Sequence, residues 1–419
     1  MPRRILLLPI GSSGDVNPFL WIGRQLHARG HEVTVVANPV FGETIRALGL
    51  RHLPFGDEAE YHALLDHPDV WHPLKGPPLV LRFAGDVTQR YFDLIATEIR
   101  ADDPPLVLAP ATAFGARLAR EKFGFPLVSV HLQPCIFLTV GDTPLVSRLF
   151  GWLQKIPPWA KRAFFAFIRA RIGAEVNPGV RQACRAVGIP PPKNAFREWW
   201  QSPDGGVCLW PEWFGPPQPE WAPGVVNVGF PLYDLADQIA LAPALEAFLA
   251  AGPPPVLFTP GTAMAQGAEF FATALAACRR AKVRAIFATK FPATLPALPP
   301  EIFHVAYAPF SALLPRCAAI VHHGGIGTTS QALAAGIPQL IRPFSHDQPD
   351  NAARVRRLEV GECLWPNQFT AENLTPALAN LLTDEARRHR CAAMADRLHA
   401  ERPADRLLTA LEPHFRDSR

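Results

Sequence analysis

The chain lacks the closely spaced cysteines of a disulfide framework or a zinc site. Its seven cysteines are odd in number and scattered, and no Cys-x-x-Cys pair occurs among them. Secreted disulfide-rich domains and structural zinc sites both depend on closely spaced cysteines. We therefore expect reduced thiols, most of them small buried hydrophobic residues, and a cytoplasmic location.

A long hydrophobic run is also missing. No stretch of about 18 uncharged apolar residues occurs, so no membrane-spanning helix is predicted. The N-terminus imitates a signal peptide, because two arginines precede an apolar run. This run is short, contains Pro9 and continues into Gly11 to Asp15 instead of a cleavage site. We interpret Ile5 to Ile10 as the first buried strand.

Neither sign of charge is in strong excess. The formal net charge is +4, which provides no global basic field for nucleic acid. A length of 419 residues with 48% hydrophobic residues suits two domains, each with its own core.

The dinucleotide fingerprint Gly-x-Gly-x-x-Gly is absent after the first strand. The turn there is Gly-x-x-Gly, and the second predicted strand, Glu32 to Ala37, ends at Asn38 instead of an acidic ribose ligand. A nicotinamide-dependent oxidoreductase is therefore disfavoured.

Strand and helix patterns alternate along the chain, which predicts an α/β fold with doubly wound parallel sheets. A helix is predicted over Trp159 to Ile172. Further strands are predicted at Leu106 to Ala109, Leu127 to Val130, Gly224 to Leu232, Val256 to Thr259, Ala285 to Thr289 and Ala318 to Val321.

The most informative stretch is Ala319 to Gly336, AIVHHGGIGTTSQALAAG. A buried strand stops at two histidines, crosses a glycine-rich turn and enters a helical pattern. Glycines let the backbone approach a ligand closely, and the helix start near Thr328 offers unpaired N–H groups to an anion. The pattern predicts a phosphate site, with a tight turn that binds nothing as the alternative. Asp347 and Gln348 follow, and a carboxylate beside an amide suits vicinal hydroxyls. Phosphate and polyol together indicate a sugar nucleotide.

These residues resemble the donor-binding signature of the family 1 glycosyltransferases, which transfer sugars from nucleotide diphosphates. The chain is similar to bacterial rhamnosyltransferases of rhamnolipid synthesis and, more distantly, to sterol and glycopeptide-antibiotic glycosyltransferases. The similarity extends over nearly the whole chain, including Asp69 to Pro73 and Ser202 to Phe214. It implies a GT-B fold, in which two Rossmann-like domains face a cleft. The implied parts are an acceptor-binding domain at 1–232, a linker at 233–243, a nucleotide-sugar-binding domain at 244–395 and a C-terminal helix at 396–419 that crosses back to the first domain.

The resemblance also implies the reaction. We expect an inverting, metal-independent transfer of a hexose from a UDP-glucose or dTDP-rhamnose type of donor to a hydroxyl of a hydrophobic small molecule or lipid. The donor is a co-substrate, and neither a resident cofactor nor a metal site is expected. Asp15 follows the first strand at the edge where α/β sheets bind ligands, and the resemblance makes it the general base. The alternative is that Asp15 only caps the following helix.

The expected ligand contacts fall into two groups. Plant members have a tryptophan where this chain has Tyr307, and Phe310 replaces a glutamine, so uridine and thymidine both remain open. The acceptor-binding residues expected are His131, Trp152 and Phe164. The donor-binding residues expected are Ser12, Ser13, Gly14, Thr259, Gly261, Thr262, Tyr307, Ala308, His323, Gly325, Gly327, Thr328, Asp347 and Gln348.

Residues 143–174 contain six basic side chains and no acidic one, interleaved with aromatic residues. Ordinary packing, an entrance for an apolar acceptor and peripheral contact with the inner membrane are the three interpretations of this stretch. A sugar-nucleotide epimerase and a non-catalytic sugar-nucleotide-binding subunit remain as alternative functions, because both would share the donor site.

Overall fold

The chain forms two compact units in its computed structural model, which describes residues 2–100, 102–234, 239–261, 264 and 267–415. Unit 1 comprises Met1–Pro231 and Arg402–Arg419, and unit 2 comprises Leu232–Glu401. Unit 1 is therefore built from two separate segments of the chain. The stretch 233–243, expected as a linker, lies within unit 2. The return to unit 1 begins at Arg402 instead of 396, because the last helix of unit 2 continues to His399.

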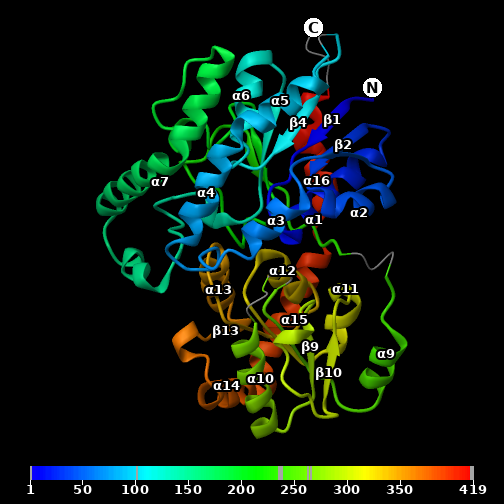
Figure 1. The fold of residues 1–419 in the computed structure, drawn as a ribbon. Helices are drawn as coiled ribbons and strands as arrows, with labels where there is room; N and C mark the ends of the chain where they lie inside the picture. The colour runs from blue at the N-terminus through cyan, green and yellow to red at the C-terminus, as the bar shows by residue number, and fades with distance from the viewer. Residues whose placement is uncertain (1, 101, 235–238, 262–263, 265–266, 416–419) are drawn as a thin grey trace. The chain divides into compact units, whose positions relative to one another are not determined.

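Unit 1 contains a parallel sheet with the order β3-β2-β1-β4-β5-β6-β7 in the described part of the chain. Figure 1 shows β2, β1 and β4 of this sheet side by side. The order reverses its direction at β1, as in doubly wound folds. Ile5 pairs with Val33 on one side and with Leu106 on the other. The strands are β1 (Arg4–Leu7), β2 (Glu32–Ala37), β3 (Arg51–Pro54), β4 (Leu106–Ala109), β5 (Leu127–His131), β6 (Gly206–Cys208) and β7 (Val225–Asn227).

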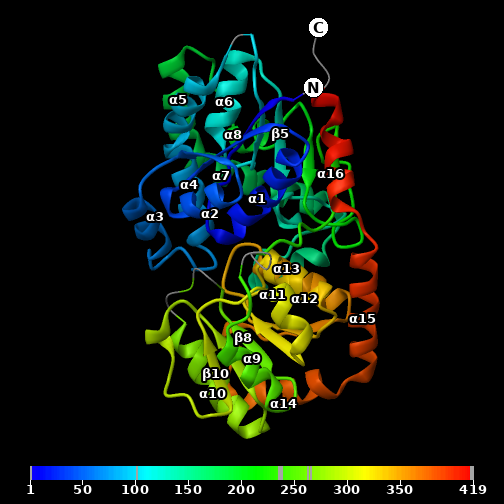
Figure 2. The same cartoon turned by 90° about the vertical axis from the view of Figure 1, so that its right-hand side faces the viewer.

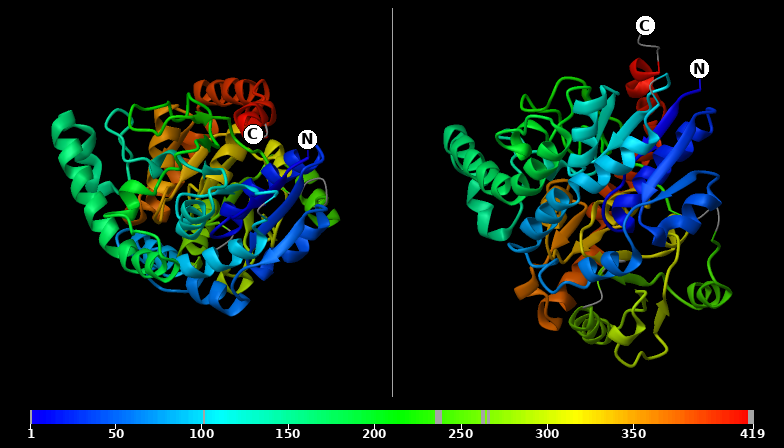
Figure 3. Two further views of the ribbon diagram at one scale, coloured as in Figure 1. Left: turned by 90° about the horizontal axis from the view of Figure 1, so that it is seen from above. Right: turned by 45° about the horizontal axis from the view of Figure 1, so that its top comes forward.

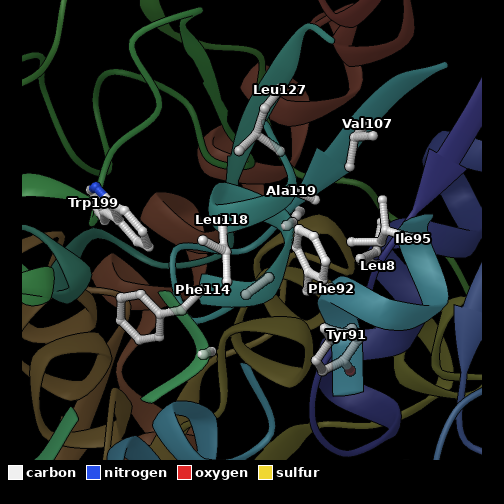
Figure 4. Close-up of a cluster of buried hydrophobic side chains, with 14 of the residues drawn as sticks. Leu8, Tyr91, Phe92, Ile95, Val107, Phe114, Leu118, Ala119, Leu127 and Trp199 are labelled. Carbon is white, nitrogen blue, oxygen red and sulfur yellow. The ribbon is translucent and has the colours of Figure 1, made fainter. Parts of the chain in front are cut away.

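Helices cover both faces of this sheet. Leu6 and Val107 belong to a core that also contains residues of α5, α6 and α7. Figure 4 shows Val107 in this core with Phe92 of α5 and Leu118 of α6. Leu7 and Val33 lie on the other face, close to Gly23 of α1, and α16 packs beside α1. The α-helices are α1 (Ser13–His27), α2 (Gly42–Ala47), α3 (Glu58–Leu65), α4 (Gly76–Asp86), α5 (Thr88–Glu98), α6 (Phe114–Phe123), α7 (Pro158–Val187), α8 (Ala195–Glu198) and α16 (Pro403–Leu411). The 3-10 segments are η1 (Pro39–Phe41), η2 (Pro134–Ile136), η3 (Arg148–Gln154) and η7 (Glu412–His414).

Unit 2 repeats this architecture with the strand order β10-β9-β8-β11-β12-β13 among its described residues, again all parallel. Its strands are β8 (Val256–Thr259), β9 (Ala285–Ala288), β10 (Ile302–Val305), β11 (Ala319–His322), β12 (Gln339–Ile341) and β13 (Gly361–Cys363). The sheet order again reverses at its first strand, β8, so the loops after β8 and β11 meet at the point where ligands bind in such sheets.

The helices of unit 2 enclose two cores. One core includes residues of α10 and α14, and the other includes residues of α9, α11 and α12. Helix α15 packs against α12 (Figure 2). The α-helices are α9 (Pro243–Ala250), α10 (Ala268–Ala281), α11 (Phe310–Leu313), α12 (Ile326–Ala334), α13 (Gln348–Arg357), α14 (Ala371–Thr383) and α15 (Glu385–His399). The 3-10 segments are η4 (Pro292–Thr294), η5 (Leu314–Arg316) and η6 (Pro366–Gln368).

The predicted fold class is confirmed, since both units are doubly wound α/β structures. Some predicted bounds are wrong. β1 ends at Leu7 instead of Ile10, and β7 ends at Asn227, shortly before Gly229 takes a φ of +106°. Helix α7 reaches Val187 instead of Ile172, and Pro178 lies inside it. Among the described residues, no helix is long and apolar enough to span a bilayer.

Candidate active site

Asp15 lies in the first turn of α1, directly after the loop that leaves β1. Its Oδ2 accepts hydrogen bonds from the backbone N–H of Ser12 at 2.8 Å and from the Ser12 hydroxyl at 3.1 Å. This is the acidic half of a capping box. No hydrogen bond to Oδ1 occurs in the described part of the chain. Asp15 therefore does cap α1, as the alternative interpretation expected, and its Oδ1 remains available to a ligand.

Gly11 allows the carboxylate to occupy this position. Its φ of +128° lies in the left-handed region, and a Cβ atom placed on it would come within 2.3 Å of Asp15 Oδ2. Any other residue at position 11 would displace the carboxylate. Gly11 is a site residue that the sequence analysis missed, although its place directly after the first strand was a usable signal.

The electrostatics of Asp15 suit a proton acceptor. Burial raises the pKa of Asp15 from 3.8 to about 6, even though both hydrogen bonds from Ser12 act to lower it. Tyr61 of α3 lies near enough that the Asp15 charge adds to burial in raising the pKa of Tyr61 to about 12. A carboxyl group with a pKa near 6 is ionised at neutral pH and more basic than an exposed aspartate.

His322 and His323 at the end of β11 have opposite roles. His322 is fully buried. Its Nδ1 accepts from the backbone N–H of Gly324 at 3.1 Å, and its Nε2 lies 3.0 Å from the Gln339 side-chain oxygen. These partners require a neutral ring that is protonated on Nε2, and burial lowers the pKa of His322 to about 3. His322 thus supports the glycine turn and uses up the N–H of Gly324.

His323 is held between two glycines. A Cβ atom on Gly325 would lie 2.5 Å from His323 Nε2, and one on Gly261 would lie 3.0 Å from the same atom. Nδ1 is buried and has no hydrogen-bond partner among the described residues. Burial lowers the pKa of His323 to about 4. The His323 ring is therefore neutral at physiological pH.

The N-terminus of α12 lies next to these histidines. The N–H of Ile326 donates to Asp347 Oδ2 at 3.3 Å, and the N–H of Thr329 donates to the Gly325 carbonyl at 2.9 Å. The N–H groups of Gly327 and Thr328 have no acceptor within the described residues. Two unpaired N–H groups at the positive end of a helix dipole form an anion site.

Asp347 and Gln348 begin α13. Asn351, one turn further along, donates from Nδ2 to Asp347 Oδ2 at 2.7 Å and to the Gly324 carbonyl at 2.9 Å. Asn351 therefore joins the glycine turn to the carboxylate. The sequence analysis missed this residue, although its i+4 spacing from Asp347 was a signal. Gln348 Oε1 accepts from the N–H groups of Phe344 and Ser345, so the Gln348 amide nitrogen is the atom left for a ligand.

The other residues predicted to bind the donor lie in different surroundings. The Thr259 hydroxyl accepts from the Gly261 N–H at 3.2 Å and so supports its own turn. Ala308 packs in a hydrophobic core, and half-buried Tyr307 precedes it. Thr262 lies outside the described residues. Ser12 is the N-cap residue of α1, and Ser13 and Gly14 lie with Asp15 in the first turn of this helix in unit 1.

The three residues predicted to bind the acceptor do not lie together. His131 is fully buried at the end of β5, and neither of its ring nitrogens has a hydrogen-bond partner in the described part of the chain. Burial lowers its pKa to about 3. In this structure His131 is a core residue that touches Phe137 edge-on at 4.6 Å, so it presents no surface to an acceptor. Trp152 and Phe164 do come together, with ring centroids 5.6 Å apart.

Comparisons with known proteins show which proteins this chain is similar to. The family model for the erythromycin biosynthesis protein CIII-like C-terminal domain matches residues 280–410. O-mycaminosyltylonolide 6-deoxyallosyltransferase of Streptomyces fradiae is 30% identical over 98% of this chain and 97% of its own length. Vancomycin aglycone glucosyltransferase of Amycolatopsis orientalis is 29% identical, over 91% of each chain.

Solved structures show the same fold. The glycotransferase of kitacinnamycin superposes with a TM-score of 0.75 at 19% identity, covering 99% of this chain and 100% of that one. The glycosyltransferase VinC in complex with DTDP gives a TM-score of 0.70 at 20% identity, with the same coverage.

Proposed function

Because this chain belongs to the family 1 glycosyltransferases, and is thus a GT-B glycosyltransferase of the natural-product type, we propose that it transfers a hexose with inversion from a UDP- or dTDP-sugar to a hydroxyl of a hydrophobic acceptor. The observation that carries the proposal is the Asp15 carboxylate. It is fixed by Ser12 through one oxygen, free at the other, and has a pKa of about 6.

Asp15 accepts the proton of the acceptor hydroxyl in this mechanism. An alcohol is a far weaker acid than a carboxylic acid, so proton transfer to Oδ1 accompanies the attack of the oxygen on the anomeric carbon. The raised pKa makes Asp15 a better proton acceptor than an ordinary aspartate, and Ser12 fixes the direction of the carboxylate. The attack comes from the face of the sugar opposite the nucleotide, which inverts the anomeric centre.

Negative charge develops on the departing nucleoside diphosphate as the glycosidic bond to it breaks. The N–H groups of Gly327 and Thr328 and the dipole of α12 are oriented toward such a charge before the reaction begins. His323 contributes as a neutral N–H donor through Nε2. We propose that these groups carry the charge without a divalent cation.

Asp347 and Gln348 are the proposed contacts of the sugar hydroxyls. Asn351 and the N–H of Ile326 hold the Asp347 carboxylate, and the loop N–H groups hold Gln348. Both side chains are thus oriented by the protein before a sugar arrives, which lowers the entropic cost of binding it.

The test compares the protein with its Asp15→Asn variant in the presence of UDP-glucose or dTDP-rhamnose and a panel of phenolic and lipid acceptors. Glycoside should form only with both substrates present. The variant should lose at least about 10³-fold in rate, as expected for loss of a general base, while UDP or dTDP binds it with unchanged affinity. Turnover retained by Asp15→Asn would refute the base. A nucleotide-sugar isomer formed without glycoside would indicate an epimerase instead.

A further inference from the structure

Helix α7 has an apolar stripe that no other part of the described chain covers. Residues at positions i, i+4, i+7, i+8 and i+11 share one face of a helix. Along α7 these positions are all apolar and all exposed, and Trp159 is 71% and Phe167 60% exposed. The stripe consists of Trp159, Ala163, Ala166, Phe167 and Ala170.

The stripe is not needed to hold α7 in place. The helix packs inward through a different face, on which Phe165 is 3% exposed and Val176 is fully buried. Figures 1 and 3 show α7 at the outer edge of unit 1. When a helix is apolar on two faces and packs through one of them, the other face is available to bind a partner.

The segment before α7 enlarges the exposed apolar surface. In η3, Leu149 is 66% and Trp152 48% exposed. The Trp152 ring packs edge-on against Phe164 of α7, with centroids 5.6 Å apart. Trp152 therefore lies beside α7, next to the turn that presents Phe167.

Unpaired positive charge borders the stripe. Arg162 and Arg171 form no ion pair within the described residues, and Glu175, one turn after Arg171, pairs with Arg82 instead. With 3.6 residues per turn, Arg162 lies about 40° from one edge of the stripe and Arg171 about 40° from the other. Cations on both sides of an aromatic and alanine strip fit a broad, uniformly anionic surface with an apolar interior.

We propose that the α7 stripe binds reversibly to the surface of an anionic phospholipid membrane. Trp159 and Phe167 would enter the boundary between headgroups and acyl chains, with Trp152 at its margin, and the flanking Arg162 and Arg171 would contact lipid phosphates. Lipid fits better than a protein groove, because the alanines keep the strip shallow and the charges lie on both sides of it. The site is separate from the catalytic residues of the proposed function.

Flotation of the full-length protein with vesicles tests this. The protein should float with vesicles of phosphatidylcholine containing about 30% phosphatidylglycerol, and bind at least about tenfold more weakly to pure phosphatidylcholine. Raising the salt from about 0.1 to 0.5 M should weaken the binding, because the Debye length shortens.

Two pairs of variants locate the contact. Trp159→Ala/Phe167→Ala should reduce binding about tenfold or more, whereas Leu74→Ala/Phe123→Ala, which removes two other exposed hydrophobic residues of unit 1, should not. Arg162→Gln/Arg171→Gln should reduce it about thirtyfold, whereas Arg29→Gln/Arg185→Gln should have a much smaller effect. All variants should keep the wild-type melting temperature. Equal loss in the test and control pairs would overturn the proposal. Failure of the wild type to float with either vesicle would also overturn it and leave a protein as the partner of the stripe.

Discussion

At the scale of single residues, Asp15 determines the expected pH dependence. Its pKa of about 6 is that of the free protein, so the logarithm of kcat/KM should fall with unit slope as the pH decreases below about 6, where the carboxylate becomes protonated. His323 does not produce this limb, because its pKa of about 4 keeps it neutral there. Ser12→Ala removes a hydrogen bond that lowers the Asp15 pKa and should move the limb to higher pH, whereas Ser13→Ala should not. A limb that stays in place in Ser12→Ala would contradict this assignment.

The adjacent histidines allow a second residue-scale prediction. His322→Ala leaves the Gly324 N–H and the Gln339 side-chain oxygen without their partners, so it should reduce the free energy of unfolding by about 2–4 kcal/mol. His323→Ala breaks no hydrogen bond among described residues and should change stability by less than about 1 kcal/mol. It should instead lower kcat by about 10²-fold, the usual effect of losing one donor to a developing anion. Thermal unfolding and initial rates separate the two effects, and a reversed pattern would exchange the roles of the histidines.

Sequence reasoning reached Asp15 because it follows a clear strand, and His323 because it precedes a glycine turn and a helix. It could not determine that His323 is neutral or that His131 is enclosed. Both properties arise from burial by residues distant in sequence, such as Gly261 for His323 and Gly206 for His131. Asn351 was missed for a related reason, because its importance comes from the Gly324 carbonyl that the fold brings to it.

At the scale of elements, local signals located β2 and β4 at their observed bounds but underestimated α7. Gly173 and Pro178 resemble helix breakers in the sequence. In the structure Gly173 makes room for Asn194, which would lie 2.4 Å from an added Cβ atom. The glycine serves close packing here. A single sequence does not distinguish this use of glycine from termination of a helix.

The contact between α4 and α7 gives a prediction at this scale. A Cβ atom on Gly179 would come within 2.3 Å of the Gly85 carbonyl oxygen, so Gly179→Ala must push the two helices apart. We expect a loss of about 1–3 kcal/mol in the free energy of unfolding. Gly151→Ala is the matched control, because no atom lies within 4 Å of its added Cβ; it should be neutral within about 0.5 kcal/mol. Urea unfolding of both variants checks this, and equal stability would show that α4 and α7 can separate at no cost.

At the scale of the whole molecule, the predicted family, two-unit α/β fold and enzyme class were confirmed. They could be predicted from the sequence because the glycine turn and its flanking residues are specific to the family. The return of the chain to unit 1 was predicted at residue 396, whereas it begins at Arg402.

The assembly of unit 1 from two separate segments leads to a prediction about stability. Leu407 and Leu411 of α16 are fully buried, Arg3 donates to the His414 carbonyl at 2.9 Å, and His31 stacks on Phe415 at 4.5 Å.

A chain that ends at Glu401 should therefore lose stability in unit 1 and not in unit 2. Removal of two buried leucines alone costs about 3–6 kcal/mol. Calorimetry should show a lowered transition for unit 1, while UDP or dTDP still binds and stabilises unit 2. A chain that ends at Phe415 is the control and should behave as the full-length protein. Equal destabilisation of both units by the shorter truncation would contradict the division.

The same discontinuity matters while the protein is being made. The sheet of unit 1 leaves the ribosome first, but α16 follows only after residues 232–401 have been translated. At 5–20 residues per second this takes about 10–30 s. During that time the face of α1 that α16 will cover stays open to chaperones and to other nascent chains. Unit 2 can finish folding as soon as it emerges, whereas the unit that carries Asp15 is completed only after α16 has been synthesised.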